Sequence, residues 1–234
     1  MDPVAIIRRA SVRLADVAAA DASVPVTRYP GWTMLDLVVH TGSVHRRTIV
    51  TIETRAQERV GRVFPPDEEP ATVLPWFGEG ATRMADLLEA TDPATRVWGF
   101  GDGWSVGSWR LRMALETDVH RWDAEQSVGE PAAVDPALAA AGIGEFIALW
   151  GGMLEVPAGS VLGMRASDTD DTWTLTAGDG GVRAIPGGDA AGVIGPASDL
   201  YLWLSARVPL DALEHRPATR LWDVALRALP DAKR

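Results

Sequence analysis

The sequence of 234 residues predicts an α+β protein, with a four-helix bundle followed by a small C-terminal α+β domain. Two observations predict this class. Apolar residues recur at helical spacing over long segments of the first half. Beyond about residue 155, short runs with β character are separated by Gly and Asp pairs, as hairpins require. We therefore expect a helical domain at residues 1–155 and an α+β domain at residues 156–234.

The helices of the predicted bundle are separated by breaks rich in Pro and Gly. The second helix has the clearest start, because Thr33 is followed three residues later by Asp36, which is typical of a capping box. Its apolar pattern can continue to about Val60, where Gly61 favours an end. The predicted helices cover about 3–20, 33–60, 72–90 and 108–127.

The second half begins with one further predicted helix and then changes its pattern. The helix covers about 136–154. The expected strands are 160–166, 172–177, 182–185 and 192–194. Two more helical patterns follow at 197–207 and about 219–229. This order of helix, short strands and helices predicts a separate α+β domain.

Composition and charge exclude several classes of protein. The net charge of −10 argues against a nucleic-acid-binding protein, which needs a basic face. Cysteine is absent, which excludes disulfides, thiolate metal sites and a cysteine nucleophile, and is compatible with a reducing cytoplasm. We identify no apolar run close to the roughly 18 residues that span a bilayer, and no signal peptide. We therefore expect a cytoplasmic protein without membrane or nucleic-acid partners.

Three side chains have the chemistry of a metal site. Glu116 and His120 are four residues apart on a predicted helix, so both lie on one face. His40 lies on the apolar stripe of the second helix and points towards the bundle axis. Carboxylate oxygen and imidazole nitrogen are common ligands of zinc, and three protein ligands leave a coordination position open, as in catalytic sites.

Other interpretations of these residues stay open at this stage. Glu and His four residues apart also occur on solvated helices, and a lone His40 can be a core histidine. His45 lies about 140° further round the helix than His40, so we do not expect it to share the site, although it can flank it. His215 lies between two charged residues and is expected at the surface.

Three segments together resemble the mycothiol-dependent maleylpyruvate isomerase family, which belongs to the DinB-like metal-binding bundles. They are GWTMLDLVVH at 31–40, RMALETDVHRWDAE at 112–125 and ASDLYLWLSAR at 197–207. The resemblance implies that His40, Glu116 and His120 bind zinc or another divalent metal. It also implies that mycothiol enters the open position, for isomerisation or S-transfer on a small electrophilic substrate, which can be a carboxylate.

The resemblance further implies that an arginine of the C-terminal domain holds a substrate carboxylate, and Arg207 is the candidate catalytic residue. The alternative is that Arg207 is a cation favouring the helix dipole. Asp123 can orient a ligand, or form a salt bridge with Arg121 or another arginine of the bundle. Three further arginines are candidate anion contacts, with a solvated surface as the default: Arg46, Arg47 and Arg83.

Two other functions remain alternatives to a thiol-dependent enzyme. A metal-dependent hydrolase would use zinc-bound water at the same ligands. A non-catalytic module would bind an apolar ligand or partner in its C-terminal domain. The expected partners of the enzyme are a small-molecule substrate and a low-molecular-weight thiol, and its substrate and oligomeric state stay open.

Overall fold

A computed structural model describes residues 1–129, 131–188 and 192–229. The chain forms two compact units, Met1–Val134 and Asp135–Arg234. The first unit contains the predicted helical bundle, and the second contains helices and a mixed five-stranded sheet, which confirms the α+β class. The units divide after Val134 rather than near residue 155, because the helix α5 (Pro136–Trp150) packs against the second unit's helix α6 and strand β3.

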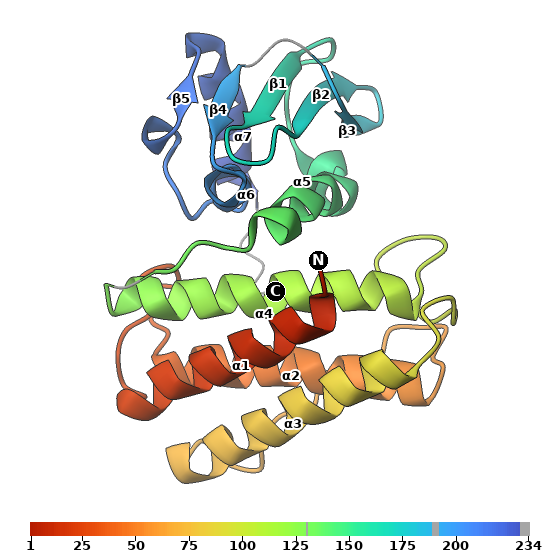
Figure 1. Ribbon diagram of the computed structural model, residues 1–234, viewed down its shortest axis with the longest axis vertical. Coiled ribbons are helices and arrows are strands. Elements are labelled where there is room, and N and C mark those ends of the chain that lie inside the picture. Colours follow the sequence, from red (N-terminus) through yellow and green to blue (C-terminus); the bar gives the residue numbers. More distant parts are fainter. Residues whose placement is uncertain (130, 189–191, 230–234) are drawn as a thin grey trace. The chain divides into compact units, whose positions relative to one another are not determined.

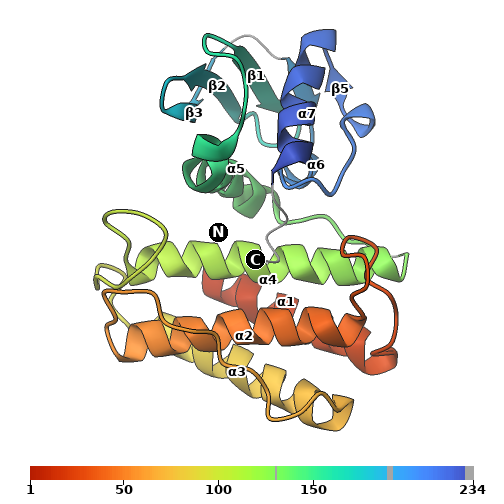
Figure 2. The same cartoon turned by 180° about the vertical axis from the view of Figure 1, so that it is seen from behind.

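The bundle of the first unit is formed by four long helices. These are α1 (Pro3–Ala20), α2 (Met34–Glu53), α3 (Pro70–Ala90) and α4 (Val106–Ser127). Helix α1 packs mainly on α4 and α3, and α2 packs on α3 and α4 (Figure 1). The view from behind shows α2 running alongside α4 (Figure 2). Their packed faces bury a core that includes the fully enclosed side chains of Phe77 and Trp109.

Local capping explains why these helices begin where they do. The side chain of Asp2 accepts hydrogen bonds from the first amides of α1. Thr33 and Asp36 form the predicted capping box of α2, with the Thr33 amide donating to Asp36 Oδ2 at 2.8 Å. Ser105 and Ser108 form the same motif at α4. Each cap satisfies amides that have no partner inside the helix.

Helix α2 is shorter than the sequence predicts. It ends at Glu53, and Arg55 adopts a left-handed conformation with φ of 48° that cannot continue the helix. The carbonyl of Ala56 then accepts a hydrogen bond of 2.6 Å from the amide of Trp98. The expected extension to Val60 was wrong, because this long-range hydrogen bond ties the chain after Glu53 to the segment around Trp98 instead of letting the helix continue.

Close contact between α2 and α3 depends on a glycine. A Cβ atom added at Gly42 would overlap the indole ring of Trp76, and its next neighbour would be the ring of Phe77. The absence of a side chain therefore lets α3 approach the helix that contains His40.

The second unit combines a small sheet with helices. Its strands are β1 (Val161–Ala166), β2 (Thr172–Gly178), β3 (Gly181–Pro186), β4 (Val193–Gly195) and β5 (Glu214–His215). They are ordered β3-β2-β1-β4-β5, and only the β1–β4 pair is parallel among the described pairings. The helical elements after α5 are η1 (Gly151–Met153), α6 (Ala197–Leu204), η2 (Leu210–Ala212), η3 (Pro217–Thr219) and α7 (Arg220–Ala228). The short strand β5 was not predicted.

One segment of the second unit is long and apolar enough to cross a membrane. It is Pro136–Met153, which comprises α5 and the turn η1, so the expectation that no such run exists was wrong. Helix α5 packs on α6 and β3, and Ile143 and Leu138 on it are fully buried. About a third of the segment (33%) is buried inside the structure, and one helix of this length and composition is weak evidence for a membrane span.

Helix α6 also ends earlier than predicted, at Leu204 rather than Arg207. Ala206 has a φ of 61°, a left-handed conformation that terminates the helix. Arg207 therefore lies in the turn that follows α6. Its amide donates to the carbonyl of Leu202 at 2.7 Å, and its side-chain Nη1 donates to the carbonyl of Ser205 at 3.1 Å.

Candidate metal centre

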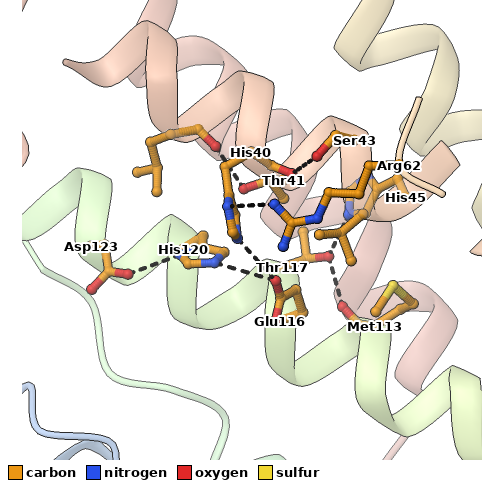
Figure 3. Close-up of polar contacts among 12 residues, drawn as sticks. His40, Thr41, Ser43, His45, Arg62, Met113, Glu116, Thr117, His120 and Asp123 are labelled. Carbon is orange, nitrogen blue, oxygen red and sulfur yellow. Dashed lines mark hydrogen bonds and ion pairs between the residues drawn. The ribbon is translucent and has the colours of Figure 1, made fainter. Parts of the chain in front are cut away.

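His40 on α2 meets Glu116 and His120 on α4 in the interior of the first unit. The Nε2 atoms of His40 and His120 lie 3.5 Å and 3.4 Å from Oε1 of Glu116. The two imidazole rings are nearly perpendicular, with an interplanar angle of 81° and centroids 5.0 Å apart. Figure 3 shows both rings directed towards the same carboxylate.

The separation of these atoms fits a single divalent cation. One potential ligand atom from each residue lies within 4.8 Å of the others. Bonds of about 2.0–2.2 Å in a tetrahedral arrangement would place ligand atoms roughly 3.3–3.6 Å apart. The measured nitrogen–oxygen distances of 3.4 and 3.5 Å fall in this range. Two imidazoles and one carboxylate therefore form a set that suits zinc and leaves a tetrahedral position for another ligand.

Asp123 positions the ring of His120. Its Oδ2 lies 3.0 Å from Nδ1 of His120, and the Asp123 side chain is fully buried. Arg121, which was one alternative partner of Asp123, pairs with Asp118 and Glu125. When Nδ1 donates its proton to the carboxylate, Nε2 keeps its lone pair for a cation. Burial lowers the pKa of His120, but the hydrogen bonds to Asp123 and Glu116 outweigh burial and raise it overall.

Glu116 is held as a carboxylate by the cations around it. Burial raises its pKa, but Arg112 and the two histidines outweigh this effect and keep the pKa well below the usual range. Arg112 Nη2 forms an ion pair with Oε2, one turn away on α4, so Oε1 faces the histidines. The carboxyl group of Glu116 is therefore ionised, and its Oε1 atom is oriented to bind a cation together with the histidines.

His40 is neutral because burial lowers its pKa. Nη1 of Arg62 lies 3.4 Å from its Nδ1, on the side of the ring away from Glu116. A guanidinium only donates, so Nδ1 is the acceptor and the proton of the neutral ring lies on Nε2, facing Glu116. Binding of a cation at Nε2 would displace this proton.

Two aromatic residues complete one side of the centre. The Trp32 ring centroid lies 5.1 Å from that of His40, and the Tyr29 centroid lies 6.1 Å from that of His120. Trp32 and Tyr29 also contact each other, with centroids 4.8 Å apart. Tyr29 is buried and Trp32 is half-buried, so the two rings form an apolar wall beside the histidines.

The other histidines lie outside the ligand set, as expected. His45 is fully buried, stacks on Phe77 and has its Nε2 2.9 Å from Oγ1 of Thr117. Thr117 donates its hydroxyl proton to the carbonyl of Met113, so Nε2 of His45 must be the donor. His215 lies in β5 of the second unit and is half-buried, so the expected surface position was wrong; its Nδ1 is 3.1 Å from the carbonyl of Leu213.

The four singled-out arginines have different surroundings. Arg83 is exposed and pairs with Glu53. Arg46 is half-buried, with its Nη2 donating to the carbonyl of Trp76. Arg47 is buried, so the expected solvated surface was wrong for this residue. Arg207 Nη1 donates to the carbonyl of Ser205, and the role of Arg207 towards a substrate carboxylate stays a prediction.

Two arginines at the centre were not assigned a role from the sequence. Arg112 could have been found, because it precedes Glu116 by four residues and such pairs meet on a helix. Arg62 carries no such signal, because it reaches His40 from the irregular connection after α2.

The buried His45 provides a pH-dependent test of the first unit. Burial lowers its pKa from 6.5 in the unfolded chain to about 3. Below pH 6.5 the unfolded chain takes up a proton that the folded protein does not, so the free energy of unfolding should fall as the pH falls towards 3. The slope from this group should approach about 1.4 kcal/mol per pH unit as the pH falls to about 5, where the unfolded histidine is almost fully protonated. Urea unfolding with a chelator present from pH 6.5 to 5.0 measures it.

The matched control for this slope is His45→Gln, which keeps a donor for Thr117 but does not titrate. We expect its free energy of unfolding to fall less steeply with decreasing pH than that of the wild type. Parallel curves for the two proteins would show that His45 does not remain neutral in the fold.

The comparison with known protein families agrees with this geometry. A family model described as "Mycothiol maleylpyruvate isomerase N-terminal domain" matches residues 4–125. This match includes His40, Glu116 and His120 and covers more than half of the chain. No curated protein and no solved structure matches the chain significantly.

Proposed function

Because the chain belongs to the mycothiol maleylpyruvate isomerase N-terminal domain family, we propose that it is a metal-dependent enzyme that uses a low-molecular-weight thiol. The thiol would be mycothiol, and the substrate a small electrophile. One observation carries the proposal: His40, Glu116 and His120 lie at separations that suit one divalent cation, which we propose is zinc, with a position left for sulfur. A cysteine-free chain must also obtain its thiol from outside.

The metal would supply Lewis acidity, which lowers the pKa of a coordinated thiol so that its sulfur is a thiolate at neutral pH. The chain's own residues would prepare the site. Asp123 fixes the His120 ring, and Arg112 fixes the Glu116 carboxylate. Tyr29 and Trp32 form an apolar wall on one side, which would reduce the solvation of a thiolate there.

Two reactions share the same first step. The thiolate sulfur forms a bond to one carbon of an activated double bond, and the π electrons move to the activating group. In an isomerase the carbon–carbon bond then rotates, the electrons return, and the carbon–sulfur bond breaks to release the thiol. In an S-transferase the carbon–sulfur bond remains and the other carbon takes up a proton.

Arg207 would bind a carboxylate of the substrate, since its planar guanidinium matches a carboxylate and the resemblance over 197–207 points to this residue. We also propose a cytoplasmic location, because that compartment keeps its low-molecular-weight thiols reduced.

Cobalt substitution tests for sulfur ligation directly. The protein is loaded with Co²⁺ and titrated with mycothiol while its absorption spectrum is recorded. We expect one equivalent to produce an ultraviolet thiolate-to-cobalt charge-transfer band, and S-methyl mycothiol, which cannot ionise, to produce none. An unchanged spectrum, together with hydrolysis of activated esters in the absence of thiol, would instead establish the hydrolase.

A further inference from the structure

Arg47 is a buried cation beside the candidate metal centre. It lies about two turns after His40 on α2, so both residues occupy the same face of the helix. Its side chain is only 5% exposed. Among the described residues, its Nε has no hydrogen-bond partner, and no carboxylate forms an ion pair with its guanidinium. Buried charges in proteins are normally paired, so a buried guanidinium without a carboxylate partner favours the binding of an anion.

Aromatic rings hold this guanidinium in place without neutralising it. The Arg47 Cζ atom lies 5.8 Å from the Trp98 ring centroid and 5.9 Å from that of Phe100. Trp98 and Phe100 also contact each other and Trp109. Such contacts offset only part of the cost of removing a charge from water. Phe100 is 45% exposed, so the guanidinium lies beneath a ring at the surface.

The charge around Arg47 is predominantly positive. Burial is the main cause that lowers its pKa to about 10, and repulsion from Arg62 adds to it. Arg59 and Arg112 contribute further repulsion, whereas Glu116 opposes it. Glu116 is already in contact with Arg112 and both histidines. A further anion would therefore relieve repulsion among these cations.

A second guanidinium, that of Arg62, lies near enough to Arg47 to lower its pKa by repulsion. Arg62 is half-buried, and its contact among the described residues is with a ring nitrogen of His40 rather than a carboxylate. Because it contacts a predicted metal ligand, Arg62 places positive charge at the edge of the centre.

We propose that Arg47, with Arg62 as its neighbour, forms a binding site on the first unit for a small carboxylate whose unsaturated body rests against Trp98 and Phe100. A planar guanidinium suits a carboxylate, and aromatic rings suit a flat apolar body. The site is separate from the role proposed for Arg207. It rests on the proposed function only in that the carboxylate would belong to the substrate.

Calorimetric titration with maleate tests this site on the full-length chain. The protein is first treated with a chelator, so that maleate cannot bind to a metal. We expect measurable binding to the wild type and at least a tenfold weaker affinity for Arg47→Met. Arg83→Met removes the same charge from an exposed ion pair and should keep its affinity within about twofold. Maleamide, the neutral analogue, should not bind, and Arg47→Lys should retain part of the affinity.

Thermal unfolding of the same variants separates binding from structure. Removal of an unpaired buried charge should leave the melting temperature of Arg47→Met unchanged or raise it, whereas a purely structural Arg47 would give a lower value. Equal maleate affinity in the wild type and Arg47→Met, or no binding to the wild type, would overturn the inference. Either result would leave the cobalt–thiol experiment unaffected, and a failed cobalt–thiol experiment would leave this carboxylate site intact.

Discussion

Replacement of His120 with alanine is expected to abolish stoichiometric metal binding. The variant loses the Nε2 atom that lies 3.4 Å from Glu116, and with it one of three predicted ligands. It also leaves Asp123 buried without the ring that it orients. Loss of an outer contact alone typically costs 10–100-fold in metal affinity, so loss of a ligand should cost more than about 100-fold. Metal analysis after dialysis, and competition with a chromogenic chelator, measure the change.

The control for this variant is His215→Ala, which removes a histidine of the second unit. It should keep one metal ion per chain. Circular dichroism of both variants checks that the helices remain. Retention of stoichiometric zinc by a folded His120→Ala would remove the basis of the proposed function.

Truncation of Trp109 is expected to have the largest effect on stability. Its side chain is fully buried and contacts the rings of Trp98, Phe100 and Trp104, with centroids 5.7–6.0 Å away. Its Nε1 donates a hydrogen bond of 2.8 Å to the carbonyl of Trp98. Trp109→Ala should lower the free energy of unfolding by about 3–5 kcal/mol, since a large cavity replaces these contacts. Urea unfolding, followed by circular dichroism, measures the loss.

Phe100→Ala is the matched control in the same aromatic cluster. Phe100 is 45% exposed, so its truncation should cost less than about 1 kcal/mol. A loss in Trp109→Ala no greater than in Phe100→Ala would mean that Trp109 is not central to this core.

Helix boundaries show how far local signals reach. The start of α2 was predictable, because the side chains of Thr33 and Asp36 each accept a hydrogen bond from the other residue's backbone amide, within one turn. Its end was not, because the hydrogen bond between Ala56 and Trp98 joins segments far apart in the chain. The assignment of α5 to the second unit likewise depends on packing against α6 and β3 rather than on its own composition.

The candidate site likewise has features that the sequence determines and features that only the tertiary structure decides. The sequence by itself determined that Glu116 and His120 share one helix face, because backbone hydrogen bonds fix side chains four residues apart. Only the tertiary structure decided that His40 reaches the same carboxylate, that Arg62 contacts His40, and that Arg47 is buried beneath Phe100. The physical reason is range: spacing along a helix is set by neighbouring residues, whereas convergence of separate segments is set by how whole faces pack.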